Sequence, residues 1–260
     1  MLHHLKTLCI GVTVLTLMAC GNMGDRRIAI PTELRVATQA SAPAPLVVVL
    51  PGRRDNIEVM SEFAIADAIQ RSWPQAEVML TSATLDYYLE GELPRRLHNE
   101  IIVPARARGV REIWLVGASL GGMGALLYER EHPGEVQGIV LLAPYLGKTK
   151  LLKEIANAGG IKTWQPGIDP QPMSARTYQL ELWRYLKTWV DRPQLAARVW
   201  IAYGDQDRLR KAIPVIAPLL RDEQILERPG AHKWSVWTPA AGEIFARIAD
   251  VSIQQGRPRP

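Results

Sequence analysis

Cysteine is nearly absent from this chain of 260 residues, which contains only Cys9 and Cys20. Cys9 lies within an apolar N-terminal stretch that we expect to be cleaved off, so at most one cysteine remains in the mature protein. A single cysteine excludes an internal disulfide. The sequence therefore predicts a fold without disulfide support.

Several kinds of site are also missing from the sequence. No H-E-x-x-H or C-x-x-C spacing predicts a metal, and no glycine-rich loop predicts bound phosphates, so we expect neither a metal nor a cofactor. Lys and Arg outnumber Asp and Glu by 31 to 26, which gives a formal charge of +5. These basic residues form no run of five or six and do not alternate with aromatic residues, so no nucleic-acid partner is expected.

The N-terminus predicts export. Residues 1–6 are weakly basic, residues 7–17 are apolar, and Leu17-Met18-Ala19-Cys20-Gly21 follows. An apolar stretch of this length is typical of a signal peptide rather than a membrane span. Its end resembles the lipobox of bacterial lipoproteins, which implies a signal peptide over 1–19 and a lipid on Cys20. The resemblance also implies attachment to a membrane facing the periplasm, and Gly21 after the cysteine favours the outer membrane. Ordinary cleavage and a retained anchor are the alternatives.

The rest of the chain is long enough for one domain with a substantial core. After Pro45, strand and helix patterns alternate, which predicts an α/β domain over 45–260 with a mainly parallel sheet and helices on both faces. Residues 20–44 are predicted to form a tether with room for one short hairpin. Strands are expected near 46–50, 76–82, 112–117, 137–143, 198–203 and 222–227, with hairpin strands at 28–30 and 34–36. Helices are expected near 57–72, 92–108, 119–131, 207–220 and 235–253.

One motif in the sequence predicts a catalytic nucleophile. The sequence Gly-Ala-Ser-Leu-Gly-Gly at 117–122 directly follows the apolar run 112–116. This is the G-x-S-x-G pattern of a nucleophile elbow, in which a strand turns sharply into a helix and presents a serine. Glycines beside Ser119 supply the space that the strained turn requires. Ser119 is the predicted nucleophile.

A histidine and an acid should follow such a serine, in the order serine, acid, histidine. His3 and His4 lie in the predicted signal peptide, His98 precedes the serine, and His132 ends the helix after it. His232 lies in a loop before the final helix and alone has the expected position. It is the predicted general base, against the alternative of a surface or core histidine.

Two aspartates compete for the role of the acid. Both follow the predicted strand at 198–203, in the turn Gly204-Asp205-Gln206-Asp207. Neighbouring turn residues point in different directions, so we expect only one to reach the histidine. The G-x-x-D pattern favours Asp207, and Asp205 is then a turn residue that accepts a backbone hydrogen bond.

The predicted oxyanion hole has two backbone donors. One is the N–H of Leu120, which follows the nucleophile, and the other comes from the loop after the strand at 46–50. Gly52 lets the backbone approach a substrate, and the N–H of Arg53 or of Arg54 is the donor. The two arginines would also favour an anionic substrate. The alternative is that they are solvated or pair with nearby acidic residues.

Together these segments resemble a known family. The serine motif at 117–126, the turn at 204–207 and the histidine loop at 229–237 are similar to those of small single-domain α/β-hydrolase serine esterases, near esterase D and the feruloyl esterases. This resemblance implies an α/β-hydrolase fold and a serine hydrolase that cleaves the carboxylic ester of a small molecule through an acyl-enzyme. A catalytically silent binding module, an acyltransferase and a peptidase of the same fold are the alternatives.

An insertion at about 146–197 interrupts the alternation. It is predicted to contain a helix at 148–158, a Gly/Pro-rich link and a second helix at 174–190. The resemblance implies a lid over the active site. Large rings are frequent in it, and Trp164 and Trp183 are candidates for the substrate pocket, against the alternative that such rings pack the lid onto the domain.

Overall fold

The computed structural model of the protein describes residues 25–167 and 169–254. The predicted signal peptide at 1–19 and the predicted lipidation site Cys20 lie outside these residues. Within them, no helix has both the length and the apolar character needed to cross a membrane.

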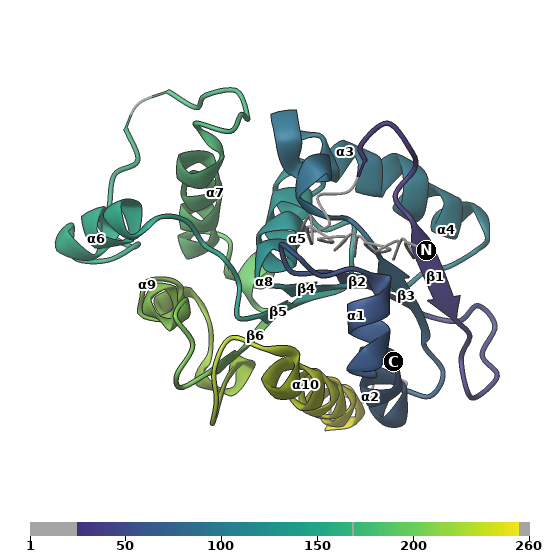
Figure 1. The fold of residues 1–260 in the computed structure, drawn as a ribbon. Coiled ribbons are helices and arrows are strands. Elements are labelled where there is room, and N and C mark those ends of the chain that lie inside the picture. The colour runs from purple at the N-terminus through teal and green to yellow at the C-terminus, as the bar shows by residue number, and fades with distance from the viewer. Residues whose placement is uncertain (1–24, 168, 255–260) are drawn as a thin grey trace, which may run out of the picture.

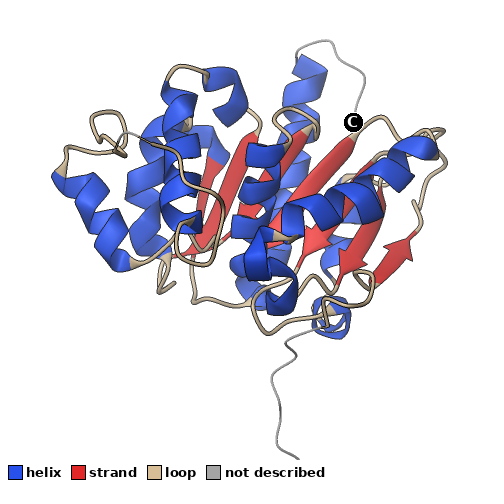
Figure 2. Cartoon of the chain, turned by 90° about the horizontal axis from the view of Figure 1, so that it is seen from above, coloured by secondary structure: helices blue, strands red, loops and turns tan. Residues whose placement is uncertain are grey.

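A seven-stranded sheet forms the centre of the molecule (Figure 2). Its order is β1-β3-β2-β4-β5-β6-β7, and all neighbouring strands are parallel except β1, which is antiparallel to β3. β2, β4 and β5 are buried along their whole length, as expected for continuous apolar strands covered on both faces. The strands are β1 Thr32–Arg35, β2 Leu46–Leu50, β3 Glu77–Thr81, β4 Ile113–Ala118, β5 Gly138–Leu142, β6 Val199–Gly204 and β7 Ile225–Arg228.

Helices cover both faces of the sheet (Figure 1). α2 and α10 pack on one face together with α1, while α3, α4 and α5 lie on the other. Two separate apolar clusters result, one on each face. The helices are α1 Ile57–Glu62, α2 Ile65–Ser72, α3 Leu93–Leu97, α4 Val103–Ala107, α5 Leu120–Glu131, α6 Thr149–Asn157, α7 Tyr178–Lys187, α8 Pro193–Ala196, α9 Ile213–Ile216 and α10 Trp234–Gln254.

Three predicted elements differ from the structure. The helix expected over 57–72 is divided into α1 and α2 at Ala64, which has φ +51°. The helix expected over 207–220 is reduced to α9 between short 3₁₀ turns, since Pro214 and Pro218 lack the N–H groups that a long helix needs. The prediction of an N-terminal hairpin is wrong, because among the described residues β1 is the only strand before β2, and it pairs with β3.

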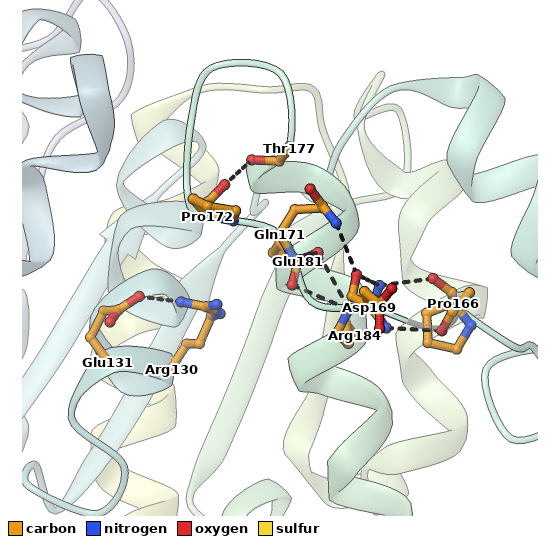
Figure 3. A network of polar contacts seen from close by, with 10 residues as sticks. Arg130, Glu131, Pro166, Asp169, Gln171, Pro172, Thr177, Glu181 and Arg184 are labelled. Atoms are coloured by element: carbon orange, nitrogen blue, oxygen red, sulfur yellow. Dashed lines mark hydrogen bonds and ion pairs between the residues drawn. The ribbon is translucent and has the colours of Figure 1, made fainter.

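The insertion contributes α6, α7 and the link between them, at one end of the molecule (Figure 1). Arg184 of α7 holds this link in place (Figure 3). Its guanidinium donates to the carbonyl oxygens of Pro166 at 2.9 Å and Gly167 at 3.1 Å, and it pairs with the buried Glu181 at 3.2 Å. Glu181 also accepts a hydrogen bond from the backbone N–H of Gln171 at 3.1 Å. One helix therefore fixes the path of a segment with little regular structure.

Candidate active site

Ser119 lies between β4 and α5 in a strained conformation. Its φ of +51° and ψ of −107° are uncommon for a residue with a side chain, and such strain is found at functional sites. The turn is tight enough to require glycine: a Cβ on Gly117 would lie 2.3 Å from the carbonyl oxygen of Gly121. The predicted elbow is therefore present as a strand, a sharp turn and a helix.

The structure brings Ser119, His232 and Asp207 into one hydrogen-bonded chain. Nε2 of His232 lies 2.9 Å from Oγ of Ser119, and Nδ1 of His232 lies 2.7 Å from Oδ2 of Asp207. The three residues follow β4, β7 and β6, which are parallel, so their carboxyl ends meet at one edge of the sheet. Ser119 and Asp207 are buried, at 7% and 2% exposure.

Asp205 and Asp207 have different partners. Oδ1 of Asp207 accepts from the N–H of Leu209 at 2.7 Å, which leaves Oδ2 for the histidine. Oδ1 of Asp205 instead accepts from the N–H of Gly230 at 2.8 Å. Asp205 therefore ties the turn after β6 to the histidine loop, while Asp207 contacts the imidazole.

Aromatic rings support the histidine loop, a role that the sequence reasoning missed. Trp237 meets the imidazole of His232 edge to face, with ring centroids 4.7 Å apart. Trp234 packs against Trp237 and donates from Nε1 to Oδ2 of Asp55 at 2.9 Å. Both tryptophans lie in the first turns of α10, within five residues of His232. This short spacing is the feature of the sequence from which the contact could have been predicted. They restrict the positions that the imidazole can adopt.

The two residues predicted to supply the oxyanion donors border the same cavity as the nucleophile. Leu120 begins α5, where backbone N–H groups have no partner within the helix and the helix dipole is positive. Arg53 follows β2 and borders the same cavities as Ser119. A Cβ placed on Gly52 would lie 3.8 Å from Cβ of Ser119, so this loop approaches the nucleophile closely.

Comparison with known proteins identifies the family. The family model described as "Putative esterase" matches residues 32–248. The chain belongs to this esterase family.

Solved structures agree with this fold. Est1E from Butyrivibrio proteoclasticus has a TM-score of 0.61 at 14% identity, over 89% of this chain and 98% of its own. S-formylglutathione hydrolase from Staphylococcus aureus has a TM-score of 0.61 at 13% identity, over 84% and 92%. The fluorophosphonate-binding serine hydrolase FphF from the same organism has a TM-score of 0.60 at 15% identity, over 83% and 91%. A search of curated proteins found no match. The esterase-family chain thus has the predicted α/β-hydrolase fold.

Two cavities border Ser119, and a third adjoins one of them. The first, of about 400 Å³, contains His232 and is bordered by Arg53, Arg54, Arg208 and Lys233. The second, of about 280 Å³, also borders Ser119, shares Arg53 and Arg208 with the first, and includes Leu120, Tyr145 and Tyr178. A third, of about 260 Å³, shares Leu85, Leu120 and Tyr178 with the second and continues away from the serine.

Trp164 and Trp183 do not reach these cavities, contrary to the predicted pocket. They are 2% and 0% exposed and belong to the apolar core. Nε1 of Trp183 donates to the carbonyl oxygen of Leu146 at 2.6 Å, and Nε1 of Trp164 to Glu154 at 3.0 Å. The rings pack the insertion onto the domain, and Tyr178 is the ring of the insertion that lines the cavity.

One cluster of possible metal ligands occurs among the described residues, away from the triad. Nδ1 of His98 and Nδ1 of His132 lie 3.2 and 3.5 Å from Oε2 of Glu135. The two imidazoles are stacked, with centroids 4.2 Å apart and planes inclined by 3°. A metal bound by both rings would have to lie in both ring planes, and parallel stacked planes do not meet. The cluster is an arrangement of stacked rings, with His98 hydrogen-bonded to Glu135, not a metal centre.

Proposed function

We propose that the protein is a serine hydrolase that cleaves a carboxylic ester through an acyl-enzyme on Ser119. The observation that carries this proposal is the continuous chain from Oγ of Ser119 through His232 to Asp207, with links of 2.9 and 2.7 Å. The protein belongs to a family of esterases, and Ser119 borders open cavities. No cofactor takes part in the proposed reaction.

In the first half of the reaction, Oγ of Ser119 attacks the ester carbonyl carbon and its proton passes to Nε2 of His232. The backbone N–H groups of Leu120 and Arg53 stabilise the negative oxygen that forms. The C–O bond to the alcohol then breaks, and His232 returns the proton to the leaving oxygen. Asp207 holds the imidazole in one tautomer and stabilises its protonated form.

In the second half, a water molecule attacks the acyl carbon and gives its proton to His232. The acid leaves and Oγ of Ser119 recovers its proton. Loss of one oxyanion donor costs about a hundredfold or more in turnover. The same residues serve all acyl transfer, so the proposal names the carboxylic ester as the substrate class to be tested first.

The test is ester turnover and labelling by a fluorophosphonate probe, measured on the domain without residues 1–20. We expect the wild type to hydrolyse p-nitrophenyl esters and take up the probe, and Ser119→Ala to do neither while keeping its circular dichroism and melting temperature. A folded wild type that does neither would contradict the proposal and favour a silent binding module. Faster product formation when an acceptor alcohol is supplied would identify an acyltransferase, and cleavage of amides in preference to esters would identify a peptidase.

We further propose that the protein is exported and held at the outer membrane, facing the periplasm, by a lipid on Cys20. The support is the apolar stretch at 7–17 and its lipobox-like end. Labelled palmitate should be incorporated into the full-length protein and not into Cys20→Ser, which should leave the membrane fraction. Equal membrane recovery of the two forms would contradict the anchor.

A further inference from the structure

The cavities at the site differ in chemistry. The cavity that contains His232 carries positive charge, and the cavity that extends from Leu120 past Met123 is lined mostly by apolar and aromatic groups. A further cavity at Ser119 shares residues with both and is mixed, because Arg53 and Arg208 line it together with leucines and tyrosines. An ester has two parts that must lie on opposite sides of its carbonyl carbon. The difference between the cavities therefore carries information about both parts of the substrate.

The charged side is strongly basic. Four cations, Arg53, Arg54, Arg208 and Lys233, border it against one carboxylate, Asp55. They come from three loops, which follow β2, β6 and β7. Among the described residues none of the four has an ion-pair partner. Asp55 is already a hydrogen-bond acceptor for Trp234 at 2.9 Å. A cavity with this charge attracts anions and concentrates them near Ser119.

The cavity that extends away from Ser119 beyond Leu120 is apolar. Leu85, Leu120 and Tyr178 line the cavity next to Ser119 and the one beyond it, where Met123 and Leu127 continue the wall. The hydroxyl of Tyr88 donates to the carbonyl oxygen of Leu120 at 3.2 Å, and burial raises the pKa of this phenol, so it remains neutral. Such a surface gains free energy by removing an apolar group from water.

The position of His232 decides which part of the ester lies on which side. The imidazole must protonate the leaving alcohol oxygen, so the alcohol has to depart on the side where His232 lies. His232 borders the basic cavity, together with Arg54 and Lys233, and it borders neither of the other two cavities. The basic cavity is thus the alcohol side, and the acyl group extends through the mixed cavity into the apolar one.

We propose that the substrate is an ester between an apolar acyl group and an alcohol that carries an anionic group, such as a phosphate monoester. Arg54, Arg208 and Lys233 bind the anion, and Arg53 contributes its side-chain charge in addition to its backbone N–H. The acyl group extends past Leu120 toward Met123 and Leu127. This inference rests on the proposed function, because it assigns the two halves of the ester to different cavities at the proposed active site.

The test compares two esters that differ only by a phosphate group on the alcohol, 1-octanoylglycerol 3-phosphate and 1-octanoylglycerol, below the concentration at which they aggregate. We expect kcat/KM to be at least about tenfold higher for the phosphate ester at low ionic strength, with the ratio falling as salt is added. 3-O-Octanoylglycerate, which carries a carboxylate, distinguishes a general preference for anions from one for phosphate.

Variants that each remove one positive charge show which residues produce the preference for the phosphate ester. Arg54→Gln and Arg208→Gln should each lower the ratio of the two kcat/KM values about fivefold, as expected for loss of one exposed cation near the anion. Arg111→Gln removes the same charge before β4, at the opposite edge of the sheet, and should leave the ratio unchanged. Melting temperatures of all variants confirm that they fold.

The outcomes separate this inference from the proposed function. If wild type hydrolyses both esters equally, in a reaction that Ser119→Ala abolishes, the charge inference is overturned and the serine hydrolase stands. A high ratio that Arg54→Gln and Arg208→Gln leave unchanged would also overturn it. If wild type hydrolyses neither ester and takes up no fluorophosphonate, the proposed function and the inference fail together.

Discussion

At the scale of single residues, the turn after β6 assigns different tasks to two similar side chains. Asp205 accepts a hydrogen bond from the N–H of Gly230, and Asp207 accepts one from the imidazole of His232. The two residues are two positions apart, and a tight turn points them in different directions. The spacing from Gly204 favours Asp207 in the sequence, and the geometry of the turn supplies the physical reason.

Replacing each aspartate by asparagine should separate the tasks. Asp207→Asn removes the negative charge that orients and stabilises the imidazole, so kcat should fall by about 10⁴. Asp205→Asn keeps an oxygen acceptor for Gly230 and should lower kcat less than about tenfold. Steady-state kinetics on one ester measures both, and equal losses in the two variants would contradict the assignment.

At the scale of the elements, the end of β7 is tied to the middle of α10 across the histidine loop. Arg228 at the end of β7 forms an ion pair with Glu243 of α10, which also pairs with Arg247 at 2.8 Å. Hydrogen bonds from Arg228 and Arg247 hold the pKa of Glu243 below its ordinary value. Since the loop between these elements carries His232, the Arg228–Glu243 pair helps to fix the position of the imidazole.

The low pKa of Glu243 predicts a pH-dependent contribution to stability. A carboxyl whose pKa is lower in the folded state stabilises the fold above its unfolded pKa, and this stabilisation is lost as the pH falls. Glu243→Gln should therefore be less stable than wild type at pH 7, and the difference should shrink below about pH 4. Urea unfolding at several pH values measures it. Glu223→Gln, which removes the exposed pair with Arg221, should have little effect at any pH.

Elements with a strong pattern could be predicted from the sequence, and elements decided by packing could not. Strands β2 and β4 are continuous apolar runs, and α5 follows a glycine-rich elbow, so their positions were predicted to within a residue or two. The break at Ala64 has no local signal. The same holds for Trp164 and Trp183. The sequence shows that the insertion is rich in large rings, but it does not show whether a given ring faces a substrate or the core.

At the scale of the whole molecule, a buried ion pair joins helix α5, which covers one face of the sheet, to the start of strand β6. Glu129 of α5 is fully buried and pairs with Arg198, which directly precedes β6. It also accepts from the N–H of Gly134 at 3.0 Å. Burial raises the pKa of this carboxyl, while the charge of Arg198 opposes the rise. The elbow helix and the strand that leads to Asp207 are thereby held together on the far side from the site.

Removing Arg198 should destabilise the whole domain. Arg198→Ala leaves a buried carboxylate without its partner, and the free energy of unfolding should fall by about 3–5 kcal/mol at pH 7. The loss should become smaller at lower pH, because protonation relieves the unpaired charge. Arg130→Ala, which removes a surface pair with Glu131, should cost less than about 1 kcal/mol. Equal losses in urea unfolding would contradict the role of the buried pair.

The central claim is tested most directly by determining which residue carries the covalent adduct of a fluorophosphonate. The folded domain is treated with a fluorophosphonate, digested, and mapped by mass spectrometry. The account predicts one adduct, on the peptide that contains Ser119, and a sharp fall in labelling for His232→Ala. An adduct on another residue, or no adduct on a folded domain, would contradict an acyl-enzyme mechanism at Ser119.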